Sequence, residues 1–166
     1  MKTERDERLR RIELQSVAEF LESLIGVRQE IRGLRERKDQ IAQQIVEVSA
    51  TKITGEVRGA EVQDIGRLLE KLESAQERVV QKMIELLDKE AIAQLLLDKC
   101  QDRISRTILR ARYISGNSWR YIATGICGYK DISYPQKLKR EALDYLERTT
   151  TMQEVVAEAK IKRLIK

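Results

Sequence analysis

The stretch RYISGNSWRYIATGICGYK, residues 112–130, differs in composition from the chain around it. It holds the only Trp, three of the five Tyr and three of the eight Gly in a sequence of 166 residues. The rest is built mainly from Glu, Arg, Lys and Leu. Aromatic side chains fill compact cores, and glycines permit tight turns. We therefore expect a small folded module here, carried by longer and simpler helices.

Start and stop signals divide this module into short helices. The turn-forming residues SGN at 115–117 follow a helical apolar repeat, and Ser118 then stands at an N-cap position. Gly128 closes the next helix, because glycine tolerates the left-handed conformation of a helix end. Ser133 is predicted to cap a last helix, with Pro135 in its first turn. This order of short helix, turn and basic helix is typical of a helix-turn-helix motif.

The last predicted helix has an inner and an outer face. Leu138, Ala142, Tyr145 and Leu146 share the face that packs inward. Arg and Lys on the other face suit guanine or phosphate, and Gln suits adenine. The predicted DNA-binding residues are Arg112, Arg120, Lys130, Ser133, Tyr134, Gln136, Lys137 and Arg140. The predicted core of the motif is Tyr113, Trp119, Ile122, Ala123, Gly128, Leu138 and Ala142.

The first 98 residues carry two long apolar stripes with alternating steps of three and four. The first stripe contains Val17, Phe20, Leu24, Val27, Ile31, Leu34, Lys38, Ile41, Ile45 and Val48. The second contains Val62, Ile65, Leu69, Leu72, Gln76, Val79, Met83, Leu86, Glu90, Ala93 and Leu97. Between them, residues 49–61 hold two glycines and a β-branched cluster, which predicts a loop. The pattern fits an antiparallel hairpin or an intermolecular coiled coil, and does not separate the two.

We therefore predict an all-α chain with three parts. Residues 1–98 form a helical hairpin or coiled-coil arm with a loop near 49–61. Residues 99–148 form a small helix-turn-helix domain, and residues 149–166 a short C-terminal helix or tail.

Charge points to a polyanion as partner. The chain has a formal net charge of +5, and residues 99–148 hold eleven Lys/Arg against five Asp/Glu. No His is present, and the two Cys lack CxxC spacing, so we expect no metal site and no cofactor. No nucleophile–base set or P-loop is found, which argues against an enzyme and a small-molecule substrate. Without a long apolar run or a signal core, we expect a cytoplasmic protein that does not contact a membrane.

The string ILRARYISGNSWRYIA…GY…LKREALDYL is similar to the DNA-reading C-terminal domain of bacterial sigma factors. The arm loop SATKITGEV followed by the RY-G-SW-IA-GY-AL string more closely resembles small Gram-positive phage proteins of the ArpU/RinA-like late-gene regulator group. The resemblance runs from about residue 28 to residue 147. It implies a sequence-specific activator of phage late or related operons that binds double-stranded DNA and works with host RNA polymerase.

Two other classes of function fit the same features. A small terminase-like packaging component also joins helix-turn-helix modules to oligomerising arms, and a large ring would favour it. A coiled-coil interaction protein with a degenerate motif would show no salt-sensitive DNA binding. The arm predicts a homo-oligomer, and a dimer would favour the regulator.

Overall fold

The computed structural model describes residues 3–53 and 59–165, and the side chains of 3–50 and 64–165. Every regular element in these ranges is helical, which confirms the predicted all-α class. In chain order they are α1 (Glu4–Glu13), α2 (Val17–Ile53), α3 (Gly59–Asp98), α4 (Arg103–Leu109), the π-helical turn η1 (Arg110–Ile114), α5 (Trp119–Tyr121), the π-helical turn η2 (Ile122–Ile126), α6 (Ser133–Thr149) and α7 (Met152–Ile161). None of the described helices is long and apolar enough to cross a membrane.

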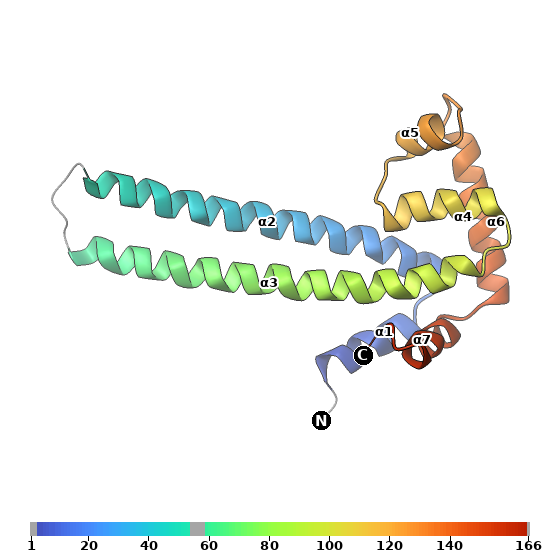
Figure 1. Cartoon of the computed structure of the whole chain (residues 1–166), viewed down its shortest axis with the longest axis horizontal. Helices are drawn as coiled ribbons and strands as arrows, with labels where there is room; N and C mark the ends of the chain where they lie inside the picture. Colours follow the sequence, from blue (N-terminus) through green and yellow to red (C-terminus); the bar gives the residue numbers. More distant parts are fainter. Residues whose placement is uncertain (1–2, 54–58, 166) are drawn as a thin grey trace. The chain divides into compact units, whose positions relative to one another are not determined.

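The long helices α2 and α3 form the predicted hairpin and run side by side in opposite directions (Figure 1). The expected loop near 49–61 was too long, because α2 continues to Ile53 and α3 begins at Gly59. β-branched residues lower helix propensity by only a few tenths of a kcal/mol each, and extending a helix that already exists is favourable. Residues 54–58 lie outside the described part.

The chain divides into two compact units, which are described separately. The hairpin unit is Val27–Glu85, and the terminal unit combines Met1–Gly26 with Leu86–Lys166. This division differs from the predicted boundaries at 98 and 148. The reason lies in packing: the ends of α2 and α3 contribute Phe20, Leu24, Leu96 and other residues to the core that also holds the motif.

The terminal unit is built around one large apolar cluster. Tyr113 lies in it together with residues from α2, α3, α6 and α7, and all of these side chains are almost wholly buried. The tail forms the predicted C-terminal helix, α7, whose N-cap Thr151 and Glu154 make a reciprocal capping box. α7 packs on α1, with the Lys160 ammonium 3.1 Å from the Glu13 carboxylate. The two ends of the described chain therefore share one core.

The first apolar stripe is confirmed and the second is half right. In α2, positions from Val17 to Ile31 are buried and those from Leu34 to Val48 half-buried. In α3, however, Leu69 is 47% and Met83 39% exposed, whereas Ala75 is buried.

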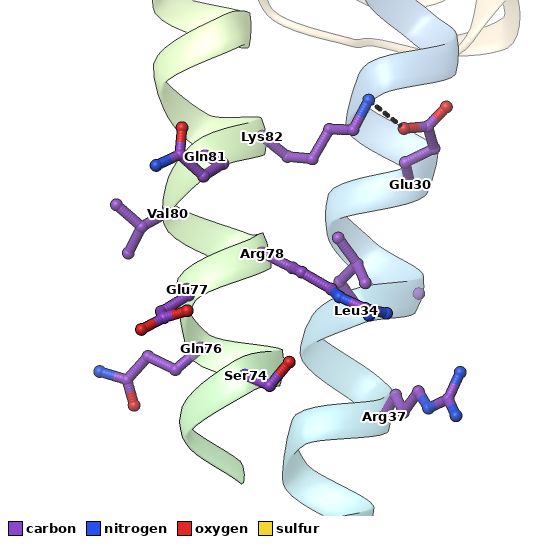
Figure 2. Close-up of a pocket in the computed structure, with 11 residues that line it drawn as sticks. Glu30, Leu34, Arg37, Ser74, Gln76, Glu77, Arg78, Val80, Gln81 and Lys82 are labelled. Carbon is purple, nitrogen blue, oxygen red and sulfur yellow. Dashed lines mark ion pairs between the residues drawn. The ribbon is translucent and has the colours of Figure 1, made fainter. Parts of the chain in front are cut away.

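The correction to the second stripe has a simple geometric cause. Leu72 and Val79 both belong to the seam with α2. The residues that complete the seam can come from one side of this pair, Ala75 and Lys82, or from the other, Gln76 and Met83. The side facing α2 holds the small Ala75 and Lys82, and the ammonium of Lys82 reaches the Glu30 carboxylate of α2 at 2.7 Å. Figure 2 shows this pair, while Val80 points away from α2. The predicted series would have placed Gln76 in the seam instead.

Candidate nucleic-acid interface

Three short helices carry the motif residues: α4 with η1, α5 with η2, and α6 (Figure 1). Asp102 is the N-cap of α4, and its carboxylate accepts a hydrogen bond from the Ser105 amide at 2.7 Å. Hydrogen bonding to the Ser105 side chain, and then to its amide, holds the pKa of the Asp102 carboxyl below its usual value. α4 contacts α6 along its length, and α6 also contacts η2. These contacts fix the orientation of α6.

The turn chemistry follows the sequence closely at two points. Ser118 is the N-cap of α5, and its hydroxyl accepts a hydrogen bond from the Tyr121 amide at 3.2 Å. Gly128 has a φ of 70°, the left-handed conformation predicted for it. The turn between the helices is therefore closed by the residues that were expected to close it.

The predicted cap of α6 is wrong. Ser133 is the first residue of the helix rather than its N-cap, which is Ile132. The Asp131 carboxylate accepts hydrogen bonds from the Ser133 amide, at 3.1 Å, and from the Ser133 hydroxyl. These bonds lower the pKa of the Asp131 carboxyl. An Asp two residues ahead of an amide accepts its hydrogen bond as readily as Ser does, and here it lies in the better position.

The predicted core of the motif is largely buried. Tyr113, Ile122 and Ala123 are fully buried, and Ala142 is 5% exposed. Leu138 and Trp119 are half-buried and pack against Ile108, Ala111 and Ile122. On α6 the inward face is the predicted one, with Leu146 buried and Tyr145 half-buried.

Two cations lie over the ring of Trp119. The Arg112 guanidinium is 5.2 Å and the Lys139 ammonium 5.6 Å from its ring centroid. Arg112 also donates a hydrogen bond to the Asn117 carbonyl at 3.1 Å. Among the predicted DNA-binding residues, Arg112 therefore has its guanidinium engaged within the fold.

A buried hydroxyl connects the motif to α2. The Tyr113 hydroxyl donates to the Glu22 carboxylate at 2.7 Å, and the Lys139 ammonium donates to the same group at 3.0 Å. Burial opposes ionisation of Glu22. The two hydrogen bonds and the nearby positive charges outweigh burial, so the pKa of Glu22 lies below its usual value. Burial, followed by the bond to Glu22, raises the pKa of Tyr113. Sequence reasoning missed Glu22, which lies in no recognisable motif, and Lys139, which lies in the last helix of the motif but was assigned to neither of its faces.

Four predicted DNA-binding residues share one face of α6. Ser133, Gln136, Lys137 and Arg140 follow helical spacing, and all but the half-buried Gln136 are exposed. The Lys137 side chain is 70% exposed, and its ammonium lies 3.8 Å from Glu141. Arg140 has no hydrogen-bond or ion-pair partner in the described part of the chain. The two cations, Lys137 and Arg140, form the C-terminal half of this face.

The other predicted contacts lie outside this face. Lys130 is exposed in the turn before α6, and Arg120 is exposed on α5. Tyr134 lies on the neighbouring edge of α6, with its ring 4.7 Å from that of Tyr129. It lines a hollow of about 410 Å³ between α4 and α6, together with Ile104. Tyr134 and Gln136 therefore lie at opposite edges of the exposed face of α6.

The hairpin unit has a groove of a different kind. An open groove of about 1030 Å³ runs beside α2 and α3 and is lined by charges of both signs, including Glu30, Arg37, Glu77 and Arg78 (Figure 2). Lys82 also lines the groove, and its ammonium is paired with the Glu30 carboxylate at 2.7 Å.

No family model, curated protein or solved structure matches this chain.

Proposed function

We propose that this protein is a sequence-specific DNA-binding transcriptional regulator of phage-type genes, and an activator that works with host RNA polymerase. In this proposal α6 docks in the major groove of double-stranded DNA. The observation that carries it is the cationic face of α6: Lys137 and Arg140 point outward from a helix whose opposite face is packed in the core. The role in activation rests on the resemblance to the phage late-gene regulator group.

The chemistry of the outward-facing residues of α6 supports base reading. Arg donates two hydrogen bonds to a guanine edge, and Gln pairs with adenine in the same groove. Arg140 and Gln136 are one helical turn apart on α6, so both reach the same groove wall. Lys137 on the same face, and the exposed Lys130 and Arg120 of the same motif, supply positive charge suited to the phosphates. A rigid helix that carries base-reading side chains together with cations fits specific binding better than uniform attraction.

The proposal is tested by binding of the full chain to fragments of its own genome at about 50 and about 200 mM salt. We expect one fragment to stay bound at the higher salt while the others are released. The variant Lys137→Ala/Arg140→Ala is expected to bind that fragment at least about tenfold more weakly, since base and phosphate contacts are worth ~1–3 kcal/mol each.

A matched variant controls for charge alone. Arg10→Ala/Arg11→Ala removes two exposed cations from α1 and is expected to bind the preferred fragment like the unaltered protein. Equal losses in the two double variants would show that affinity follows net charge and would refute the assignment of α6. Uniform binding that disappears with salt would favour a packaging component instead.

A further inference from the structure

Besides Ile84, four large apolar side chains of the hairpin unit point into solvent. Val46 is 67%, Leu69 47%, Val80 48% and Met83 39% exposed. Leu69, Val80 and Met83 are exposed because α3 uses the neighbouring series, with Ala75 and Val79 buried, for its seam with α2. Single exposed apolar residues are normal, but several on one face of a helical hairpin indicate an interaction surface.

Helical geometry places all four on one face of the hairpin. The guanidinium of Arg35 on α2 lies 3.5 Å from the sulfur of Met83 on α3, so these two flanks adjoin. Val46 follows Arg35 by eleven residues, three helical turns, and therefore lies on the same flank of α2. On α3, Val80 follows Leu69 by eleven residues and Met83 follows it by fourteen, which again keeps one flank. Since the helices are antiparallel, Val46 and Leu69 lie at nearly the same level.

The two helices of this unit carry opposite excess charge. Residues 27–53 contain six Lys/Arg and four Asp/Glu, and residues 59–85 contain four Lys/Arg and six Asp/Glu. Arg32 and Arg35 flank the apolar face on the α2 side, and Glu73 and Glu77 are exposed on the α3 side. The face therefore has a basic edge, an apolar middle and an acidic edge.

Such a face is complementary to itself under one symmetry operation. A two-fold axis parallel to the hairpin turns the face over and exchanges its edges, so the basic α2 of one copy lies over the acidic α3 of the other. Val46 then lies opposite Leu69 of the other copy. Arg35 lies at about the same level along the bundle as Glu77 of the other copy. A two-fold axis across the hairpin would instead set like charges against each other.

We propose that a second copy of this chain docks on the face formed by Val46, Leu69, Val80 and Met83. The two hairpins run parallel and form a four-helix bundle with α2 of each copy over α3 of the other. The contact is independent of the proposed DNA-reading face, because all of its residues belong to the hairpin unit. It gives the protein two copies of α6, as a two-fold symmetric DNA site requires.

The first test measures the mass of the full chain without DNA by sedimentation equilibrium. We expect a dimer. We expect Val80→Glu/Met83→Glu to raise the dissociation constant of this dimer at least about tenfold, because the variant places charges in the apolar middle of the interface. Circular dichroism should show unchanged helix content, since both side chains are already exposed. Leu14→Glu is the matched control: Leu14 is 82% exposed on the terminal unit, and this variant should remain a dimer.

A monomeric unaltered protein, a large ring, or a glutamate double variant that dimerises normally would each overturn the proposal. Dimerisation is measured without DNA, so a loss of the dimer is distinguished from a loss of DNA binding.

The second test distinguishes the arrangement of the helices. Chains carrying Val46→Cys are mixed with chains carrying Leu69→Cys and oxidised, with the unaltered protein as the background for its own two cysteines. We expect disulfide-linked dimers in the mixture and few in either variant alone, because disulfides require Cα atoms within about 7 Å. Linkage of the Leu69→Cys chain to itself at an equal yield would mean that α3 packs on α3, which contradicts the proposed arrangement.

Discussion

At the scale of single residues, Tyr113 is the clearest link between the motif and the rest of its unit. Its ring is fully buried, and its hydroxyl donates to Glu22 on α2 at 2.7 Å. The sequence predicted Tyr113 as a core residue, because it continues an apolar repeat. Its partner was not predictable, since Glu22 is one of many acidic residues on a long helix and lies 91 positions away.

We expect Tyr113→Phe to lower the free energy of unfolding by about 1–1.5 kcal/mol, as the ring stays and one hydrogen bond is lost. The value should lie at the lower end for a bond to a charged group, because Glu22 keeps its bond to Lys139 and is partly exposed. Urea denaturation measures the change. Tyr121→Phe serves as the control, because Tyr121 is 56% exposed, and an equal loss there would contradict the assignment.

At the scale of elements, two glycines three residues apart in the motif have different roles. Gly128 has a φ of 70° and ends the second helix, with open space around its missing Cβ. Gly125 lies inside η2, where an added Cβ would be 3.6 Å from the Tyr121 ring, an ordinary contact. The first position therefore requires glycine for its backbone, and the second does not.

We expect Gly128→Ala to lower the free energy of unfolding by about 1–2 kcal/mol, since an L-residue is strained in the left-handed region. Gly125→Ala should be neutral or stabilise by up to about 1 kcal/mol, because alanine is the better helix former. Thermal unfolding of both variants under the same conditions compares them. A larger loss of stability in Gly125→Ala than in Gly128→Ala would contradict these two roles.

The sequence predicted the helices and turns better than it predicted which residues pack against them. The hairpin, the N-cap at Ser118 and the turn at Gly128 rest on local rules, which operate within a few residues. The start of α6 was misplaced because Asp131 and Ser133 are both good capping residues, and only the built turn selects between them. The outer face of α3 was missed because two stripes of similar hydrophobicity share one helix, and tertiary packing decides which of them is buried.

At the scale of the whole molecule, the motif shares its core with helices from both ends of the chain. Leu109 and Leu146 belong to the same buried cluster as Phe20, Leu96 and Val155. The predicted boundaries at 98 and 148 would cut through this cluster. Local periodicity carries no information on such long-range packing, which is why the composition of the units could not be read from the pattern.

We expect a fragment of residues 99–148 to lack a cooperative thermal transition, because it leaves the side chains of the cluster without their partners from α2, α3 and α7. The full chain measured in parallel provides the reference. A sharp transition in the fragment, with the same helix content per residue, would show that the motif folds alone.

The pairing of α1 with α7 also bears on how the molecule folds during synthesis. The Glu13–Lys160 contact spans 147 positions, whereas the Glu30–Lys82 pair of the hairpin closes a much shorter loop. Closing a longer stretch of chain costs more entropy, and the C-terminal partner of α1 is synthesised last. The hairpin can therefore form on the ribosome before α1 packs against α7. Until translation reaches α7, the apolar surface around α6 stays uncovered. A prematurely terminated chain would therefore be recognised by chaperones and proteases as unfinished before it could present α6 to any partner.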